Sequence, residues 1–223
     1  MKKSIFFKII CAVLCISLVG FVFASCGKQG EVEPATSAAQ TTTSSELISA
    51  DPTAVDAPEV IGDHPQVLFT MENGGSFLME LYPEYAPESV ENFLSLVNSG
   101  FYEGLEFHRV MDGFMAQGGA SDKKTPSIYG EFASNGFAQN TLKHTRGVVS
   151  MARTNEPNSA SSQFFICYGD AEWLDGDYAA FGKVIEGMET VDAFLEIPRA
   201  YSMTGELSVP TQPIVIESAE QVD

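Results

Sequence analysis

The chain has 223 residues, of which 44% are hydrophobic and 11% aromatic, so it can bury one substantial core but is too short for three domains. Its 30 acidic residues outnumber its 12 basic residues, which gives a net charge of −18 at pH 7. Such an acidic surface repels phosphate groups, which argues against nucleic acid as a partner and against a domain lying on anionic lipid.

Residues 1–25 have the layout of a secretory signal. Three lysines, Lys2, Lys3 and Lys8, precede an uncharged and mostly apolar run at 9–24. The alternative is an uncleaved membrane anchor, because about 18 apolar residues begin to suffice for a span. Both interpretations place the rest of the chain at a membrane, outside the cytoplasm. Removal of the signal with its three lysines would change the net charge from −18 to −21.

The sequence Phe23-Ala24-Ser25-Cys26 resembles a bacterial lipoprotein signal, in which the cysteine thiol is lipidated and becomes the new N-terminus. Phe23 stands where leucine is usual in such signals. We therefore expect a lipid at Cys26 that attaches the protein to the bacterial cell membrane. Two of the other three cysteines lie within the signal, which leaves Cys167 alone in the folded part. No internal disulfide is expected, so the core must supply the stability.

Residues 26–64 are predicted to form a flexible tether. No aromatic residue occurs from 27 to 63, and Ser, Thr, Ala, Glu and Pro dominate. A segment so poor in large apolar groups cannot offset the entropy lost on ordering. As a coil it would span on the order of 35 Å. A few aliphatic residues leave a short docked piece as the alternative.

The folded domain is expected at 65–221 and begins with a β-hairpin. Two strands at 67–71 and 76–81 are joined by Asn73-Gly74, a strong hairpin signal. A helix follows Pro87, because apolar residues recur at helical spacing before Gly100. Further strands are predicted at 106–111, 114–117, 147–152, 163–167, 178–185 and 214–217, with a second short helix at 188–195. Short strands with two helices indicate an antiparallel barrel or a sandwich, and the pattern alone does not choose between them.

Three motifs in this region carry a resemblance to a known family. The run 107–119 begins Phe107-His108-Arg109, and it is followed by Ser162-Gln163-Phe164-Phe165-Ile166 and by Trp173-Leu174-Asp175-Gly176. Together they resemble the cyclophilin family of peptidyl-prolyl cis-trans isomerases, over roughly residues 66–219. The resemblance implies a mainly β fold, a closed eight-stranded antiparallel barrel capped by two α-helices, and an activity that needs no cofactor or metal.

The resemblance also implies the site residues. Arg109 would act with Gln163 and Phe165 as the catalytic group, since its always-charged fork supplies the donor that a twisted prolyl nitrogen needs. The residues implied to bind substrate are Phe114, Met115, Gln117, Ala152, Arg153, Trp173, Leu174 and Tyr178. Strand alternation puts Met115 and Gln117 on one face, so Phe114 can join them only if Gly113 bends the chain.

Two positions depart from well-known members of the family. Arg153 stands where asparagine is usual, and a second cation there would shift preference toward acidic substrate residues. Tyr178 stands where many relatives carry histidine, which changes the hydrogen bonding at the pocket wall. For either glutamine, Gln117 or Gln163, a purely structural role competes with substrate binding because a buried amide needs partners at both ends.

The expected function is rotation of X-Pro bonds in exported proteins, which would assist folding outside the cytoplasm. The expected partners are proline-containing segments of exported proteins and, through the lipid, the membrane, and we expect a monomer. The rival hypothesis is a non-catalytic chaperone or scaffold module that grips proline-bearing peptides. The three histidines form no metal-binding spacing, and no G-x-S-x-G turn of a hydrolase occurs.

Overall fold

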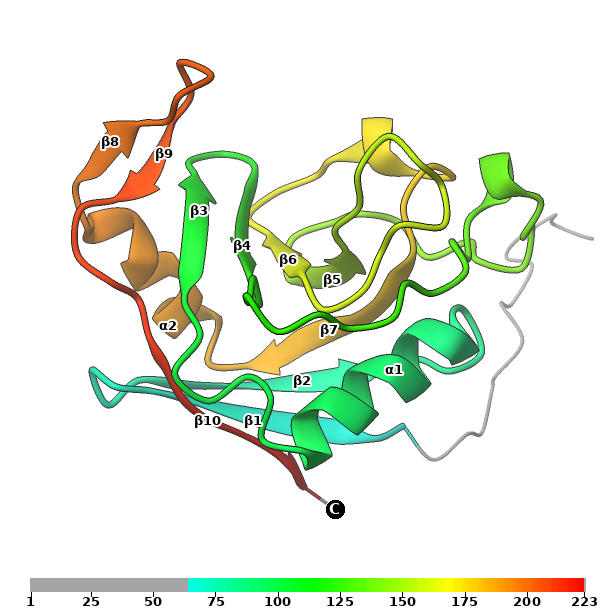
Figure 1. The fold of residues 1–223 in the computed structure, drawn as a ribbon, viewed down its shortest axis with the longest axis horizontal. Helices are drawn as coiled ribbons and strands as arrows, with labels where there is room; N and C mark the ends of the chain where they lie inside the picture. The colour runs from blue at the N-terminus through cyan, green and yellow to red at the C-terminus, as the bar shows by residue number, and fades with distance from the viewer. Residues whose placement is uncertain (1–63, 223) are drawn as a thin grey trace, which may run out of the picture. The chain divides into compact units, whose positions relative to one another are not determined.

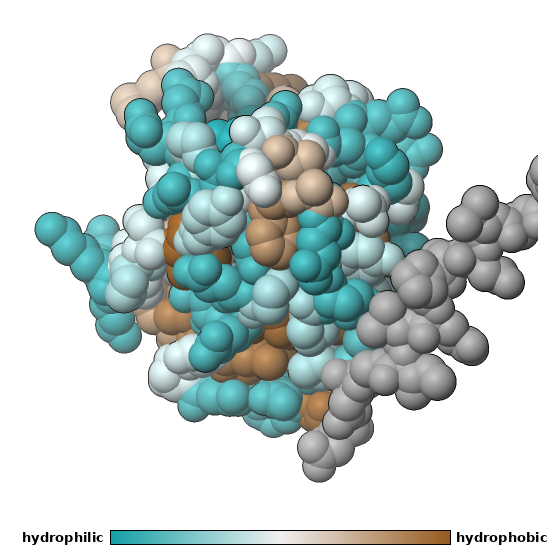
Figure 2. Space-filling view, turned by 90° about the vertical axis from the view of Figure 1, so that its right-hand side faces the viewer, coloured by the Kyte–Doolittle hydropathy of each residue, from teal (hydrophilic) through white to brown (hydrophobic). Residues whose placement is uncertain are grey.

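The computed structural model describes residues 64–222. The signal at 1–25, the lipid site at Cys26 and nearly all of the tether at 26–64 lie outside this range, so the structure does not test them. Within the described range no helix is long and apolar enough to cross a membrane. Hydrophilic side chains predominate on the face drawn in Figure 2, with smaller apolar patches between them.

Eight antiparallel strands form one strongly curved sheet, in the order β10-β1-β2-β7-β5-β6-β4-β3 (Figure 1). Its strands are β1 (Gln66–Met71), β2 (Ser76–Leu81), β3 (Phe107–Met111), β4 (Met115–Gly118), β5 (Val148–Met151), β6 (Phe164–Cys167), β7 (Ala180–Glu186) and β10 (Ile216–Val222). All eight predicted strands are therefore present. Most ends agree within two residues, whereas the last strand begins later and runs further than the predicted 214–217.

The sheet curls without closing fully. Its edge strands β3 and β10 meet at an isolated bridge between Glu106 and Val215, beside a hydrogen bond from the Phe107 amide to the Ile214 carbonyl (2.9 Å). A register irregularity between Phe107 and Arg109 bends β3 at this point. This bridge lies just outside both strands, and no residue of β3 itself pairs with β10. The predicted fold class is confirmed. The sheet is a curled half-barrel, however, and is less closed than the predicted barrel.

The helix α1 (Pro87–Asn98) packs one apolar stripe on the sheet, as predicted. Val90, Phe93 and Val97 are buried, and Pro87 occupies the first turn, where a missing amide hydrogen costs nothing. The second helix, α2 (Met188–Asp192), continues directly into the 3₁₀ turn η3 (Ala193–Glu196). The predicted helix at 188–195 is thus shorter, and it tightens in its last turn.

The first turn of α1 is capped from outside the helix. The buried carboxylate of Glu131 accepts hydrogen bonds from the amides of Glu88 and Ser89 (both 2.8 Å) and from the Ser89 hydroxyl (2.6 Å). A negative charge at a helix N-terminus satisfies free amides and is favoured by the helix dipole. Glu131 therefore ties the loop after β4 to α1.

The core inside the curved sheet is built around aromatic rings. Phe164 of β6 is fully buried. Its ring lies 5.3 Å from that of Phe93 in α1, 5.5 Å from Tyr102 and 5.7 Å from Phe107, centroid to centroid. All three pairs are edge-to-face, the arrangement that the charge distribution of aromatic rings favours. One side chain thus joins the helix to β3 and to the segment before it.

A small hairpin was not predicted. The strands β8 (Arg199–Tyr201) and β9 (Leu207–Pro210) form a separate two-stranded sheet, and β9 lies beside β3 (Figure 1). The turn between them contains Gly205 at φ +82°. The hairpin exposes several large apolar side chains, namely Tyr201, Met203, Leu207 and Val209. Through Glu206 it contacts a residue of the site described next.

Candidate active site

Strand alternation creates a second apolar cluster on the outer face of the sheet. In β6, Phe164 and Ile166 enter the main core, whereas Phe165 and Cys167 point to the opposite face. There they pack with Met115 of β4 and other apolar side chains, separate from the main core. Burial raises the pKa of the Cys167 thiol to about 12, so Cys167 serves as a small apolar residue.

This outer cluster forms the floor of an open cavity that most of the predicted site residues line. The lining consists of Arg109, Phe114, Met115, Gln117, Ala152, Arg153, Phe165, Leu174 and Tyr178. Two predicted residues are not among them. Gln163 lines an adjoining polar cavity, and Trp173, 62% exposed, packs on Phe114 with ring centroids 5.7 Å apart at the rim.

The turn between β3 and β4 brings Phe114 into the cavity. Gly113 adopts φ +68°, a conformation that favours glycine, and the Phe114 amide donates to the Met111 carbonyl (3.1 Å). The chain therefore bends where the sequence required it to bend. Phe114 and Met115, which are neighbours in the chain, both face the cavity.

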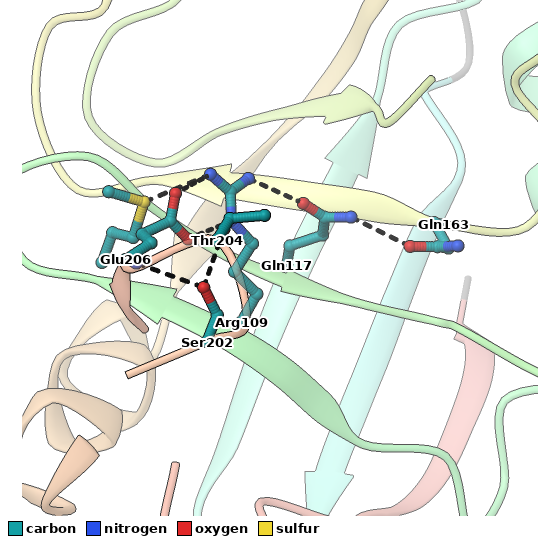
Figure 3. A network of polar contacts seen from close by, with 7 residues as sticks. Arg109, Gln117, Gln163, Ser202, Thr204 and Glu206 are labelled. Carbon is teal, nitrogen blue, oxygen red and sulfur yellow. Dashed lines mark hydrogen bonds and ion pairs between the residues drawn. The ribbon is translucent and has the colours of Figure 1, made fainter. Parts of the chain in front are cut away.

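Polar groups along one side of the cavity form a connected chain (Figure 3). Arg109 Nη1 donates to Gln117 Oε1 at 3.2 Å, and Gln117 Nε2 donates to Gln163 Oε1 at 2.9 Å. Arg109 and Gln117 are register partners in β3 and β4. The pairing of β3 with β4 therefore places the side-chain amide of Gln117 next to the guanidinium of Arg109.

Glu206 from the β8–β9 hairpin forms a bidentate ion pair with Arg109. The Nε and Nη2 atoms of the arginine each lie 2.7 Å from a carboxylate oxygen (Figure 3). Hydrogen bonding to the guanidinium lowers the pKa of Glu206 to about 2, and the same bonds raise the pKa of Arg109. Glu206 was not predicted from the sequence, because nothing local connects it with a residue 97 positions earlier.

Phe165 is supported from behind by His144, which was also not predicted as part of the site. The two rings are stacked with centroids 6.1 Å apart. His144 Nδ1 lies 3.0 Å from Asp175 Oδ1, and Nε2 lies 3.1 Å from the Ser150 hydroxyl. Burial lowers the pKa of His144, so the ring is neutral at pH 7. This network fixes the cavity floor.

Arg153 lies against Tyr178, and both side chains line the cavity. Its guanidinium lies over the ring of Tyr178 (4.6 Å to the centroid) and over that of Phe132 (4.9 Å). Its Nε donates to the Asp177 carbonyl at 2.9 Å. Arg153 also borders the adjoining polar cavity, which Thr154, Ser159 and Ser161 line with the two glutamines. A second cation is therefore held between the two cavities.

The arrangement suits a neutral ligand with an apolar ring beside a polar backbone. Apolar side chains form the floor, and fixed donors and acceptors stand along its edge, as in small-molecule sites generally. Among residues 64–222 no cluster of three His, Cys, Asp or Glu side chains could hold a metal ion.

Comparison with known proteins identifies the family. The profile described as "Cyclophilin type peptidyl-prolyl cis-trans isomerase/CLD" matches residues 67–221. Peptidyl-prolyl cis-trans isomerase A of Dickeya dadantii is 43% identical over 159 residues, which cover 66% of this chain and 80% of that protein. The cyp18 isomerase of Streptomyces antibioticus is 41% identical over 158 residues, covering 66% of this chain and 93% of that one.

Solved structures agree with the sequence comparisons. A cyclophilin-type isomerase from Cryptosporidium parvum superposes with a TM-score of 0.61 and 29% identity, covering 72% of this chain and 98% of that chain. A second structure of that protein, determined in the presence of the dipeptide Ala-Pro, gives a TM-score of 0.60 and 30% identity, covering 71% and 99% of the two chains. The chain therefore belongs to the cyclophilin family and is a cyclophilin-type peptidyl-prolyl cis-trans isomerase.

Proposed function

We propose that Arg109 supplies the donor that accelerates X-Pro rotation and that Phe114, Met115, Phe165 and Leu174 receive the proline ring. The single observation that supports this assignment is that the guanidinium and these apolar side chains line one cavity. Rotation is slow because amide resonance must be broken, with a barrier near 20 kcal/mol. No covalent bond is made or broken.

At the twisted transition state the prolyl nitrogen regains its lone pair and accepts a hydrogen bond more strongly than in the planar amide. A donor fixed beside it therefore stabilises the transition state more than the ground state. The apolar floor excludes water from the rotating bond. Gln117 and Gln163 hold the substrate backbone, and the cation of Arg153 favours substrates with acidic residues near the proline.

The site assignment is tested by exchange NMR on an Ala-Pro peptide, with the protein at a concentration far below that of the peptide. We expect cis-trans exchange faster than the uncatalysed tens of seconds, together with a change in Trp173 fluorescence as the peptide fills the cavity beside Phe114. A matched Ala-Ala peptide should neither change the fluorescence nor compete. Fluorescence change without faster exchange would favour a binding module over catalysis.

We further propose that the enzyme acts on exported proteins and assists their folding outside the cytoplasm while a lipid at Cys26 holds it at the membrane. The signal layout at 1–25 and the tether composition at 26–64 support this location. Several acyl chains hold a protein far more firmly than one, since each buried methylene contributes about 0.8 kcal/mol.

Intact-mass measurement of the membrane-extracted protein tests the lipid anchor. We expect a mass that lacks residues 1–25 and includes acyl chains, because processing would make Cys26 the N-terminus. A Cys26→Ser variant, which has no thiol to acylate, should keep its signal and its unmodified mass. A wild-type mass that still includes the signal would contradict the lipoprotein proposal.

A further inference from the structure

The guanidinium of Arg109 has a bonding partner for almost every hydrogen it carries. An arginine has five N–H groups. Nε and Nη2 each donate one to Glu206, Nη2 donates its other to Met111 Sδ at 3.3 Å, and Nη1 donates one to Gln117. With these four engaged, one N–H on Nη1 is left for a substrate.

These partners do not hold the guanidinium equally. The two bonds to Glu206 are short (2.7 Å), parallel and charged at both ends, the strongest geometry open to arginine. The amide oxygen of Gln117 is neutral and 3.2 Å away, and a thioether sulfur is a weak acceptor. The side chain of Arg109 is long and 35% exposed, so Glu206 is its main restraint.

The hairpin holds Glu206 in place before any ligand arrives. Tyr201 pairs with Leu207 in register, and the Ser202 amide donates to the Glu206 carbonyl at 2.7 Å. The Glu206 amide in turn donates to the Ser202 hydroxyl (3.2 Å), which is 2.8 Å from the Thr204 hydroxyl (Figure 3). The backbone of Glu206 is thus fixed by a short hydrogen-bonded turn, which starts its side chain beside β3.

We infer that Glu206 is a positioning residue for Arg109, which makes the β8–β9 hairpin part of the isomerase machinery. The inference rests on the proposed role of Arg109 as donor. A donor already oriented toward the place where the lone pair develops needs no reorganisation at the moment of twisting. Glu206 also offsets the positive charge of the guanidinium. The gain from a correctly oriented donor outweighs this loss of positive charge, because a misplaced donor does not stabilise the transition state.

The test compares Glu206→Ala and Glu206→Gln with wild type, by exchange NMR on an Ala-Pro peptide over a range of concentrations. We expect Glu206→Ala to lower kcat on the order of 10- to 100-fold, the effect of misplacing a catalytic group, with KM nearly unchanged. Glu206→Gln keeps the shape and one acceptor, so it should restore part of the rate. Glu196→Ala, which removes an exposed carboxylate outside the hairpin, is the matched control and should behave as wild type.

The same substitution in an Arg109→Ala background separates positioning from a general structural role. If Glu206 acts through Arg109, Glu206→Ala should change the residual rate of that background very little. Wild-type or raised kcat in both Glu206 variants, with Arg109→Ala inactive, would overturn the inference and leave the proposed function standing. Near wild-type activity of Arg109→Ala would instead refute the proposed function itself. If Glu206→Ala fails to fold, Glu206→Gln decides alone: a kcat below that of wild type supports the inference, and a wild-type kcat overturns it.

Discussion

Replacing Arg109 with alanine will remove most of the isomerase activity while the domain remains folded. The variant loses the donor beside the rotating bond, and loss of one fixed donor to a transition state costs on the order of 10² to 10³ in kcat. The fold should survive because Arg109 is partly exposed and lies outside the main core. The rate is measured by exchange NMR on an Ala-Pro peptide, and folding by circular dichroism and thermal unfolding.

Two further variants make the Arg109 result specific. Arg109→Lys keeps the positive charge but cannot form the side-on bidentate pair with Glu206, so it should recover little of the rate. Arg146→Ala removes an arginine that pairs with Asp192 (2.6 Å) and does not line the cavity, and it should retain full activity. Near wild-type turnover by Arg109→Ala would show that the donor lies elsewhere.

Replacing Phe164 with alanine will lower the free energy of unfolding by about 3–5 kcal/mol, the usual range for emptying a buried aromatic site. The ring is fully buried, and its neighbours come from α1, from β3 and from the segment before β3. They cannot all move inward to fill the space that the ring leaves. Urea denaturation followed by circular dichroism measures the change in midpoint.

The matched control is the truncation of a phenylalanine at the edge of the same core. Phe101 is only half-buried and packs against Tyr102, with centroids 5.5 Å apart. Phe101→Ala should therefore cost clearly less than Phe164→Ala. Equal decreases in the free energy of unfolding for the two variants would contradict the proposal that Phe164 is the centre of the core. Phe164→Leu, which refills part of the space with apolar atoms, should recover a share of the stability.

The elements that the sequence predicted are those that local rules determine. The hairpin of β1 and β2 follows from Asn73-Gly74 between two apolar runs, and α1 follows from helical spacing between Pro87 and Gly100. The choice of this fold over a sandwich, and the assignment of most cavity residues, came from the family resemblance. Composition and periodicity could not have made either choice, because both architectures bury one face of each strand.

The missed features depend on contacts between distant parts of the chain. β8 has three residues and β9 four, too few for an alternating pattern to stand out. Glu206 becomes a partner of Arg109 only after that hairpin has folded against β3. Glu131 caps α1 from 42 residues away, and the support of Phe165 by His144 likewise needs the assembled sheet. No local signal marks any of these pairs.

The sheet order has a consequence for when this domain can fold. β1 pairs with β10 along its whole length, from Gln66 opposite Val222 to Met71 opposite Ile216. The first strand to be synthesised therefore pairs with the last one. Pairing between such distant segments forms slowly and carries a large loop-closure cost. While the chain is still emerging from a ribosome, the edge of β1 that later pairs with β10 is open. The domain therefore completes its sheet only after its C-terminal residues have been released.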